Sequence, residues 1–299
     1  MPLRLTPLHP VFTAEADGID LTRPLSDTDV RAINAAMNQY AVLVWRGQPL
    51  TGQQQIDFAK SFGPLDLGLK KVFNRPERLE DERLIDISNV DAQGNVARRD
   101  SPKNLSNFAN QLWHSDSSFQ NPRAAYSMLH ALVLPSWGGT TEFADLRAAY
   151  DALPDAMKRR LGGLVAWHSL MTSRAKLGFS DFDETEKKAF EPVPQVLVRR
   201  LQDSGRMSLY LASHAGAISG LSKADAEALL KELIEHATQR QFVYSHRWRV
   251  NDLVMWDDRC TMHRGLEFDD QRFKRDMRRA TVSDVAPTCE QMGLAVAAE

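Results

Sequence analysis

Short apolar segments bounded by turn residues recur between residues 40 and 282, and they restrict the possible folds more than any other feature of the chain. Residues 40–45 (YAVLVW) form a continuous apolar run, which is typical of a strand buried on both faces. Residues 241–249 alternate instead, so that Phe242, His246 and Trp248 share one face. Further strands are predicted at residues 128–134, 195–199, 208–212, 253–256 and 278–282. Many short strands of this kind predict a β-sandwich or barrel.

Helical periodicity occurs in four segments that precede or separate the strands: residues 26–40, 51–62, 146–161 and 222–236. The first segment carries Val30, Ile33 and Met37 on one face after polar capping residues. Pro154 divides the third segment, which predicts two short helices there. The predicted fold class is therefore mainly β with helical decoration.

Composition excludes several classes of protein. The 299 residues are 43% hydrophobic and 25% charged, which suffices for a sizeable core. The formal net charge of -2 gives no positive field for nucleic acid or for an anionic membrane. A bilayer span needs an apolar run of about 18 residues, and no such run occurs in the sequence. We find no linker or repeat, so we expect one domain over residues 1–299, with a disordered tail from about residue 285.

Cysteine use and the first residues of the chain indicate the compartment. The two cysteines, Cys260 and Cys289, form neither a disulfide framework nor a zinc motif. Prolines interrupt the first twelve residues where a signal peptide needs an apolar stretch. A cytoplasmic location is therefore expected.

The triplet His114-Ser115-Asp116 is the strongest candidate for chemistry. If these residues lie on a strand, His114 and Asp116 project from one face and can reach one metal ion. His263 offers a third ligand shortly after the strand predicted at residues 253–256. Two histidines and one carboxylate form the facial triad of non-haem Fe(II) oxygenases, in which three coordination positions stay open.

A basic segment late in the chain adds a candidate anion site. On a strand over residues 274–281, Arg275 and Arg279 would share one face and point into one cavity. An arginine fork suits a bidentate grip on a carboxylate. If the sequence lacked His114 and His263, we would interpret the same segment as a solvent-exposed basic edge strand.

Several longer segments resemble one family, the taurine/2,4-dichlorophenoxyacetate dioxygenases, and look closest to its phenoxyacetate-degrading branch. The resemblance runs from about Leu8 to about Asp284. Four segments carry it: NFANQLWHSDSSF at 107–119, GGTTEFAD at 138–145, RAAYDALP at 147–154 and DLVMWDDRCTMHRG at 252–265.

The resemblance implies a double-stranded β-helix (jelly-roll, cupin-like) core and an oxygenase that uses Fe(II), 2-oxoglutarate and O2, with ascorbate as an aid in vitro. His114, Asp116 and His263 would bind iron. Arg275 and Thr141 would hold the far carboxylate of 2-oxoglutarate, although a one-residue shift of the alignment would substitute Lys274 for Arg275. Relatives assemble as oligomers, so a homo-oligomer is expected.

The substrate implied by the resemblance is a small carboxylate, such as a phenoxyacetate that is cleaved to a phenol and glyoxylate. Arg279 would face its carboxylate. Softer candidates for substrate contacts are Lys71, Asn110 and His214. Lys71 and Asn110 are equally compatible with a structural role, and for His214 the structural role is favoured. A taurine-like sulfonate or another alkyl or aryl carboxylate is an alternative substrate.

Two other functions fit parts of the sequence. Ser115 lies beside His114 and Asp116, as a hydrolase would require, but adjacent residues on a strand point to opposite faces and no GxSxG elbow occurs. A binding protein that has lost its chemistry could also use this scaffold. Retention of all three candidate ligands and of Arg275 favours an active enzyme.

Overall fold

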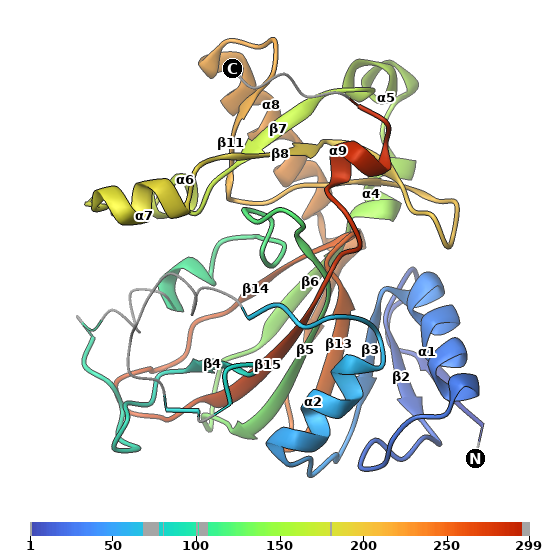
Figure 1. Cartoon of the computed structure of the whole chain (residues 1–299), viewed down its shortest axis with the longest axis vertical. Helices are drawn as coiled ribbons and strands as arrows, with labels where there is room; N and C mark the ends of the chain where they lie inside the picture. Colours follow the sequence, from blue (N-terminus) through green and yellow to red (C-terminus); the bar gives the residue numbers. More distant parts are fainter. Residues whose placement is uncertain are drawn as a thin grey trace.

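The structure is a computed structural model that describes residues 2–67, 78–79, 81–99, 101, 107–179 and 181–294. Figure 1 shows two stacked groups of elements. The lower group contains the long strands and the first two helices, and the upper group contains shorter strands and most of the remaining helices. Within the described part of the chain, no helix is long and apolar enough to cross a membrane.

A seven-stranded sheet forms the lower group. Its central strand, β5, pairs antiparallel with both β13 and β15, while β2 and β3 are parallel. In spatial order its strands are β1 Arg4–Pro7, β2 Ala14–Asp17, β3 Val42–Trp45, β13 Leu253–Asp257, β5 Ala124–Val133, β15 Asp276–Ser283 and β4 Ile85–Ser88.

A three-stranded antiparallel sheet faces the large one. Phe143 of the small sheet packs on Trp256 of the large sheet, with ring centroids 5.4 Å apart, and Met277 belongs to the same buried cluster. The strands of the small sheet are β12 Val243–His246, β6 Thr141–Asp145 and β14 Thr261–Gly265. Two facing sheets give the mainly β fold with a jelly-roll core that is expected from the sequence and its resemblance.

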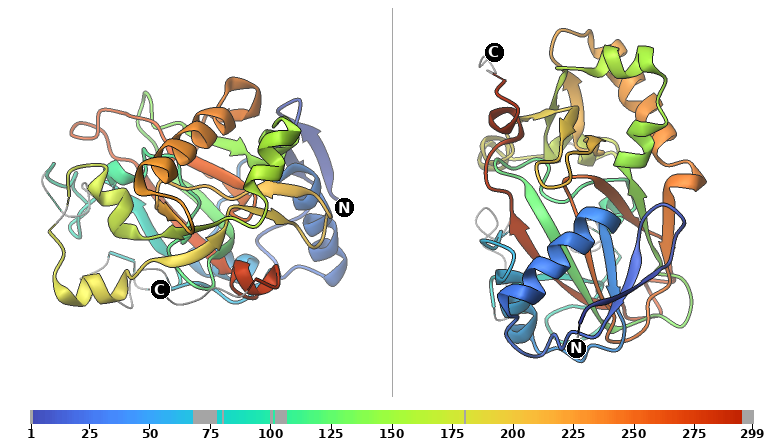
Figure 2. Two further views of the ribbon diagram at one scale, coloured as in Figure 1. Left: turned by 90° about the horizontal axis from the view of Figure 1, so that it is seen from above. Right: turned by 90° about the vertical axis from the view of Figure 1, so that its right-hand side faces the viewer.

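The upper group packs around a second apolar core, which includes Leu211 and Leu233. Its strands are β11 Ala215–Ile218, β7 Val165–His168 and β8 Val193–Val196 in one sheet, and β10 Met207–Leu209 and β9 Val198–Arg200 in another. Its helices are α4 Leu146–Asp151, α5 Asp155–Leu161, α6 Leu170–Ala175, α7 Glu184–Ala189, α8 Lys223–Ala237 and α9 Thr288–Gln291, and a 3-10 turn, η2, covers Arg240–Phe242. In the right-hand view of Figure 2, the orange α8 lies along the side of this group, next to α4.

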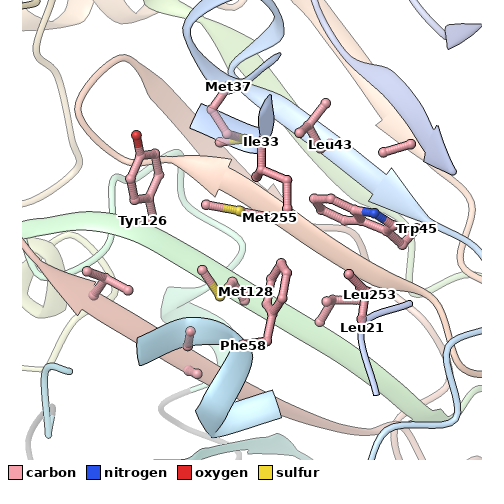
Figure 3. Close-up of a cluster of buried hydrophobic side chains, with 14 of the residues drawn as sticks. Leu21, Ile33, Met37, Leu43, Trp45, Phe58, Tyr126, Met128, Leu253 and Met255 are labelled. Atoms are coloured by element: carbon pink, nitrogen blue, oxygen red, sulfur yellow. The ribbon is translucent and has the colours of Figure 1, made fainter. Parts of the chain in front are cut away.

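Helices α1 (Asp27–Tyr40) and α2 (Gly52–Lys60) cover the outer face of the large sheet. Each starts where a capping box satisfies free backbone N–H groups, at Ser26 and at Thr51. Their apolar faces reach the strands in one buried cluster, and Figure 3 shows how tightly the side chains interlock. The labelled members are Leu21, Ile33, Met37, Leu43, Trp45, Phe58, Tyr126, Met128, Leu253 and Met255.

The predicted helices agree with the structure to within about two residues, and Pro154 separates α4 from α5 as expected. The predicted strands are less accurate, because β5 begins at Ala124 and the segment 195–199 is divided between β8 and β9. Residues 285–294 of the segment expected to form a tail lie within the described part, and they include α9. The buried Thr288 hydroxyl at the start of α9 donates to Gln195 at 2.7 Å, which ties that helix to β8.

The buried face of β3 should dominate local stability. Val44 is fully buried and Val285 is 83% exposed, so the same substitution can be compared at the two positions. We expect Val44→Ala to lower the free energy of unfolding by about 2 to 3 kcal/mol, because two buried methyl groups and their contacts are lost. Val285→Ala should change it by less than about 0.5 kcal/mol. Urea denaturation measures both, and equal effects would contradict this packing.

Stability should also fall in mild acid, because a buried histidine must be protonated on unfolding. Burial lowers the pKa of His130 to about 4, against the opposing effect of its hydrogen bond to the Gln48 carbonyl. The unfolded value is about 6.5, so the stabilisation is complete above pH 6.5 and is lost as the pH falls towards 4. We expect His130→Gln to flatten this part of the stability profile by about 2 kcal/mol at pH 5. Urea denaturation between pH 7 and 4.5 tests this, and an unchanged slope would contradict it.

Candidate metal centre

Two of the candidate ligands are joined through their backbones. His114 donates its N–H to the carbonyl of His263 at 3.0 Å, and His263 donates to His114 at 2.7 Å. This isolated bridge holds residues that are far apart in the sequence directly opposite each other. His263 lies within β14, and Trp256 packs against its ring at a centroid distance of 4.7 Å.

The Asp116 side chain lies beside the two histidines, but its backbone is part of a turn and not of the predicted strand. His114 and Asp116 were expected to lie on one strand, but only His114 forms a bridge and Asp116 begins a turn. Ser117, with φ of 50°, continues this turn in the left-handed region. The predicted convergence of the side chains is nevertheless present, because the turn brings the carboxylate back towards the imidazoles.

The three side chains form a compact, buried donor set. Nε2 of His114 lies 3.9 Å from Oδ1 of Asp116, and Nε2 of His263 lies 3.8 Å from Oδ2. All three ligand atoms are within 4.8 Å of one another. His114 Nδ1 lies 2.7 Å from the Leu112 carbonyl, so it carries the proton and leaves Nε2 free for a metal. Two imidazole nitrogens and one carboxylate fit Fe(II) and leave positions open for other ligands.

The charge states suit metal binding. Burial lowers the pKa of both His114 and His263, so both imidazoles are neutral near pH 7. Burial alone would raise the pKa of Asp116, but the adjacent Arg279, followed by the two histidines, lowers it below its ordinary value. The centre therefore offers two lone pairs and one negative charge without first losing a proton.

Neighbouring residues hold the Asp116 carboxylate in place. The Ser127 hydroxyl donates to Oδ2 at 2.8 Å, and Arg279 forms a short ion pair with Oδ1. The backbone N–H of Asp116 donates to Asp258 at 2.9 Å. Burial, followed by the charge of Asp116, raises the pKa of Asp258 well above its ordinary range. Asp258 accepts the hydrogen bond from Asp116 through Oδ1, which also accepts from Trp256 Nε1 at 3.0 Å.

A cavity opens beside the metal ligands, and Arg275 reaches into it. Gly139 permits the close approach, because a Cβ there would lie 3.3 Å from Cδ and Nε of Arg275, and its φ is +67°. Burial lowers the pKa of Arg275 to about 10, so it stays charged at neutral pH. Among the residues that the structure describes, no carboxylate pairs with it; Nε donates only to the Gly139 carbonyl at 3.3 Å. An unpaired, desolvated guanidinium is suited to a carboxylate ligand.

Thr141 lies in the same cavity, at the start of β6. Its Oγ1 accepts a hydrogen bond from Trp248 Nε1 at 2.9 Å, which leaves the hydroxyl hydrogen free to donate to a ligand. This role of Trp248 is not predicted by the sequence pattern. The only signal was its place on the apolar face of residues 241–249, which does not reveal the indole N–H contact.

The remaining candidates fall in different places. Arg279 and Asn110 line the cavity, and Arg279 also contacts Asp116. His214 is not one of the residues that line this cavity, but its ring lies 6.1 Å from that of His114. Lys71 lies outside the described residues.

Ser115 does not support a hydrolase. Its hydroxyl is fully buried and contacts the carbonyls of Leu211 at 3.1 Å and Thr261 at 2.7 Å. These contacts stabilise the connection between the two groups of elements, and they leave the hydroxyl without access to a substrate.

Comparisons with known proteins agree with this geometry. The family model described as "Taurine catabolism dioxygenase TauD, TfdA family" matches residues 4–281. The chain belongs to this dioxygenase family. The resemblance recognised in the sequence is thereby confirmed.

Members of the TauD/TfdA family that are similar to the chain include two phenoxyalkanoate enzymes. An alpha-ketoglutarate-dependent 2,4-dichlorophenoxyacetate dioxygenase of Cupriavidus pinatubonensis is 53% identical over 94% of this chain and 97% of its own. An (S)-phenoxypropionate/alpha-ketoglutarate-dioxygenase of Sphingobium herbicidovorans is 37% identical over 89% of this chain and 90% of its own.

A solved relative also matches in structure. The crystal structure of AAD-2 in complex with Mn(II) and N-oxalylglycine superposes with a TM-score of 0.89. The two chains are 45% identical, and the match covers 96% of this chain and 99% of AAD-2.

The hydrogen bond from Ser127 to Asp116 should contribute to metal affinity. We expect Ser127→Ala to weaken Mn(II) or anaerobic Fe(II) binding by about tenfold, because it removes an outer partner of a ligating carboxylate. Titration calorimetry of the metal-free protein measures this. Ser245→Ala, at an exposed serine, should bind as the unaltered protein does, and His263→Ala should abolish binding. Unchanged affinity in Ser127→Ala would contradict this role.

Proposed function

We propose that the chain is an Fe(II)- and 2-oxoglutarate-dependent dioxygenase that cleaves a phenoxyacetate, such as 2,4-dichlorophenoxyacetate, to a phenol and glyoxylate. Succinate and CO2 are the co-products. One observation carries the proposal above all: the buried His114–Asp116–His263 donor set adjoins a cavity that holds Arg275, a cation without a carboxylate partner among the described residues. The sequences of the phenoxyalkanoate relatives support the substrate class.

His114, Asp116 and His263 would hold Fe(II), and a set of three protein ligands leaves coordination positions for 2-oxoglutarate and O2. Bound iron, with 2-oxoglutarate and O2, supplies the oxidising power to hydroxylate the carbon next to the ether oxygen. The protein contributes orientation and a site protected from water. Ser127 and Arg279 hold the Asp116 carboxylate in one orientation by a hydrogen bond and an ion pair.

Arg275 and Thr141 would bind the far carboxylate of 2-oxoglutarate. The guanidinium offers parallel N–H donors, and the Thr141 hydroxyl adds a third, since Trp248 occupies one of its lone pairs. The side-chain oxygen of Asn89 accepts a hydrogen bond from the backbone N–H of Arg275 at 2.8 Å. This bond fixes the backbone of Arg275, so the residue is held in place before a ligand binds.

Substrate contacts would come from Arg279, Asn110, His214 and Lys71. Arg279 is close enough to the centre to interact with a carboxylate while it retains Asp116. The cavity walls include Phe108, Leu266 and Phe268, which suit an aryl ring. A small aromatic carboxylate thus matches both the positive charge of Arg279 and the apolar walls of the cavity. A phenoxyacetate herbicide is a substrate of this kind.

We also propose that the chain is a single cytoplasmic domain that assembles as a homo-oligomer. The two buried free thiols, Cys260 and Cys289, suit a reducing compartment and support the location. Family resemblance supports the oligomer.

Removal of the Arg275 side chain should impair 2-oxoglutarate binding selectively. We expect Arg275→Leu to raise KM for 2-oxoglutarate by about 10- to 100-fold, because a charge-assisted hydrogen-bonded pair is lost. KM for the phenoxyacetate should change far less. Arg272→Leu, at an exposed arginine three residues away, is the matched control and should behave as the unaltered enzyme. A normal KM for 2-oxoglutarate in Arg275→Leu would refute this role.

The proposed reaction is tested with purified protein, Fe(II), 2-oxoglutarate, ascorbate and air. Succinate, 2,4-dichlorophenol and glyoxylate are measured with and without 2,4-dichlorophenoxyacetate, and His114→Ala is the control. We expect substrate-dependent succinate that matches phenol release and is absent from the variant. Succinate formation that does not respond to the phenoxyacetate but rises with taurine, a sulfonate, or with another carboxylate would change the proposed substrate class. If none of these substrates gives iron-dependent succinate, the proposed dioxygenase activity is refuted.

A further inference from the structure

The Thr141 hydroxyl, one of the two groups proposed to hold the far carboxylate of 2-oxoglutarate, is itself held by an indole. Nε1 of Trp248 donates to Oγ1 at 2.9 Å, and Thr141 is 3% exposed where it lines the cavity beside the metal ligands. An indole N–H is a donor only, so the hydroxyl must accept from it and cannot direct its own hydrogen there. That hydrogen has no acceptor among the described residues, so it remains available to a ligand in the cavity.

Trp248 lies just beyond the end of β12, and a buried carboxylate holds the chain on both sides of it. Nε2 of His246 lies 3.2 Å from Oδ2 of Asp252, and the backbone N–H of Arg249 donates to the same oxygen at 2.8 Å. Asp252 is fully buried, and the guanidinium of Arg46 pairs with it at 2.5 Å. The residue two before Trp248 and the residue directly after it therefore share one anchor.

The partners of this anchor decide where its protons lie. Burial lowers the pKa of His246, so the imidazole is neutral near pH 7. Burial alone would raise the pKa of Asp252, but hydrogen bonds from His246 and from the backbone, followed by the charge of Arg46, lower it below its ordinary value. Because a carboxylate only accepts, the proton of His246 lies on Nε2, and Nδ1 accepts from the Tyr244 hydroxyl at 3.2 Å. Both nitrogens of the His246 ring thus have a partner.

The His246 ring passes this anchoring to Trp248 by direct contact. The two rings meet edge to face, with a centroid distance of 4.5 Å and an interplanar angle of 87°. His246 also lies opposite Thr141 in the pairing of β12 with β6. One residue therefore supports both sides of the indole–hydroxyl hydrogen bond, because its backbone pairs with Thr141 and its ring packs on Trp248.

We infer that Asp252 and Trp248 are positioning residues for 2-oxoglutarate, because together they fix the hydroxyl of Thr141 as a donor to the far carboxylate. This inference rests on the proposed function for the identity of the ligand, whereas the hydrogen bond from Trp248 and its anchor belong to the protein itself. Neither Asp252 nor Trp248 is among the residues that line the cavity, so each acts through Thr141 rather than by contact with the ligand.

Binding of N-oxalylglycine to the full chain loaded with Mn(II), measured by titration calorimetry, tests the role of Trp248. We expect Trp248→Phe to weaken this binding by about fivefold, because Thr141 loses the partner that orients its hydroxyl. In a Thr141→Val background the same substitution should change binding by less than about twofold. Unchanged affinity in Trp248→Phe, or an equal loss in both backgrounds, would overturn the inference.

Trp167→Phe is the matched control for the loss of an indole hydrogen bond. Nε1 of Trp167 donates to the Ser219 hydroxyl at 3.0 Å, and neither residue lines the cavity. This variant should therefore bind N-oxalylglycine as the unaltered protein does. A loss equal to that of Trp248→Phe would assign the effect to packing and contradict a specific role of Trp248.

Hydrogen exchange of the Trp248 indole N–H tests the anchor without metal or ligand. It is followed by proton–nitrogen NMR of the metal-free full chain, with Trp248→Phe used to assign the signal. We expect Asp252→Asn to speed this exchange by about tenfold, because a neutral amide holds His246 and the Arg249 N–H more weakly, while the Trp167 indole is unaffected. Unchanged exchange at Trp248, or equal acceleration at both indoles, would overturn the role of Asp252. Because no ligand is needed, this result distinguishes failure of the anchor from failure of the proposed function.

Discussion

The reciprocal hydrogen bonds between His114 and His263 are the constraint on which the site depends. They join the small sheet, through β14, to the turn that carries Asp116. Since both ligands belong to one bridge, their spacing is set by backbone geometry rather than by flexible side chains. The bridge therefore sets the positions of the two histidines, while Ser127 and Arg279 hold the carboxylate of Asp116 on its turn.

The same arrangement gives each neighbouring cation a separate task. Arg279 pairs with the Asp116 carboxylate and lowers its pKa, so it supports the centre directly. Arg275 has no carboxylate partner in the described part of the chain and keeps its donors for a ligand. Arg275, directly before β15, and Arg279, within β15, thus differ in function because only Arg279 meets an acidic side chain among the described residues.

The helix starts and the three metal ligands could be predicted from the sequence, because they depend on residue types and on their spacing. The predicted helical segments start at Ser26, Thr51 and Ser222, and in the structure the side chain of each of these residues caps the helix that follows. The convergence of His114, Asp116 and His263 came from the spacing of ligand types together with the family resemblance. The turn at Ser117 did not, since its φ of 50° reflects tertiary contacts that sequence alone does not reveal. The pairing of Arg279 with Asp116, the support of Thr141 by Trp248 and the ion pair of Arg46 with Asp252 also depend on long-range contacts, so periodicity could not find them.

The central claim is that one donor set binds the metal while Arg275 receives the far carboxylate of the keto-acid. The most direct test is a crystal structure of this chain with Mn(II) and N-oxalylglycine, the combination present in the AAD-2 structure. The account predicts Mn(II) bound by His114, Asp116 and His263, with the far carboxylate of the inhibitor on Arg275 and Thr141. Mn(II) bound elsewhere, or a carboxylate held by Lys274 or Arg279 in place of Arg275, would contradict it.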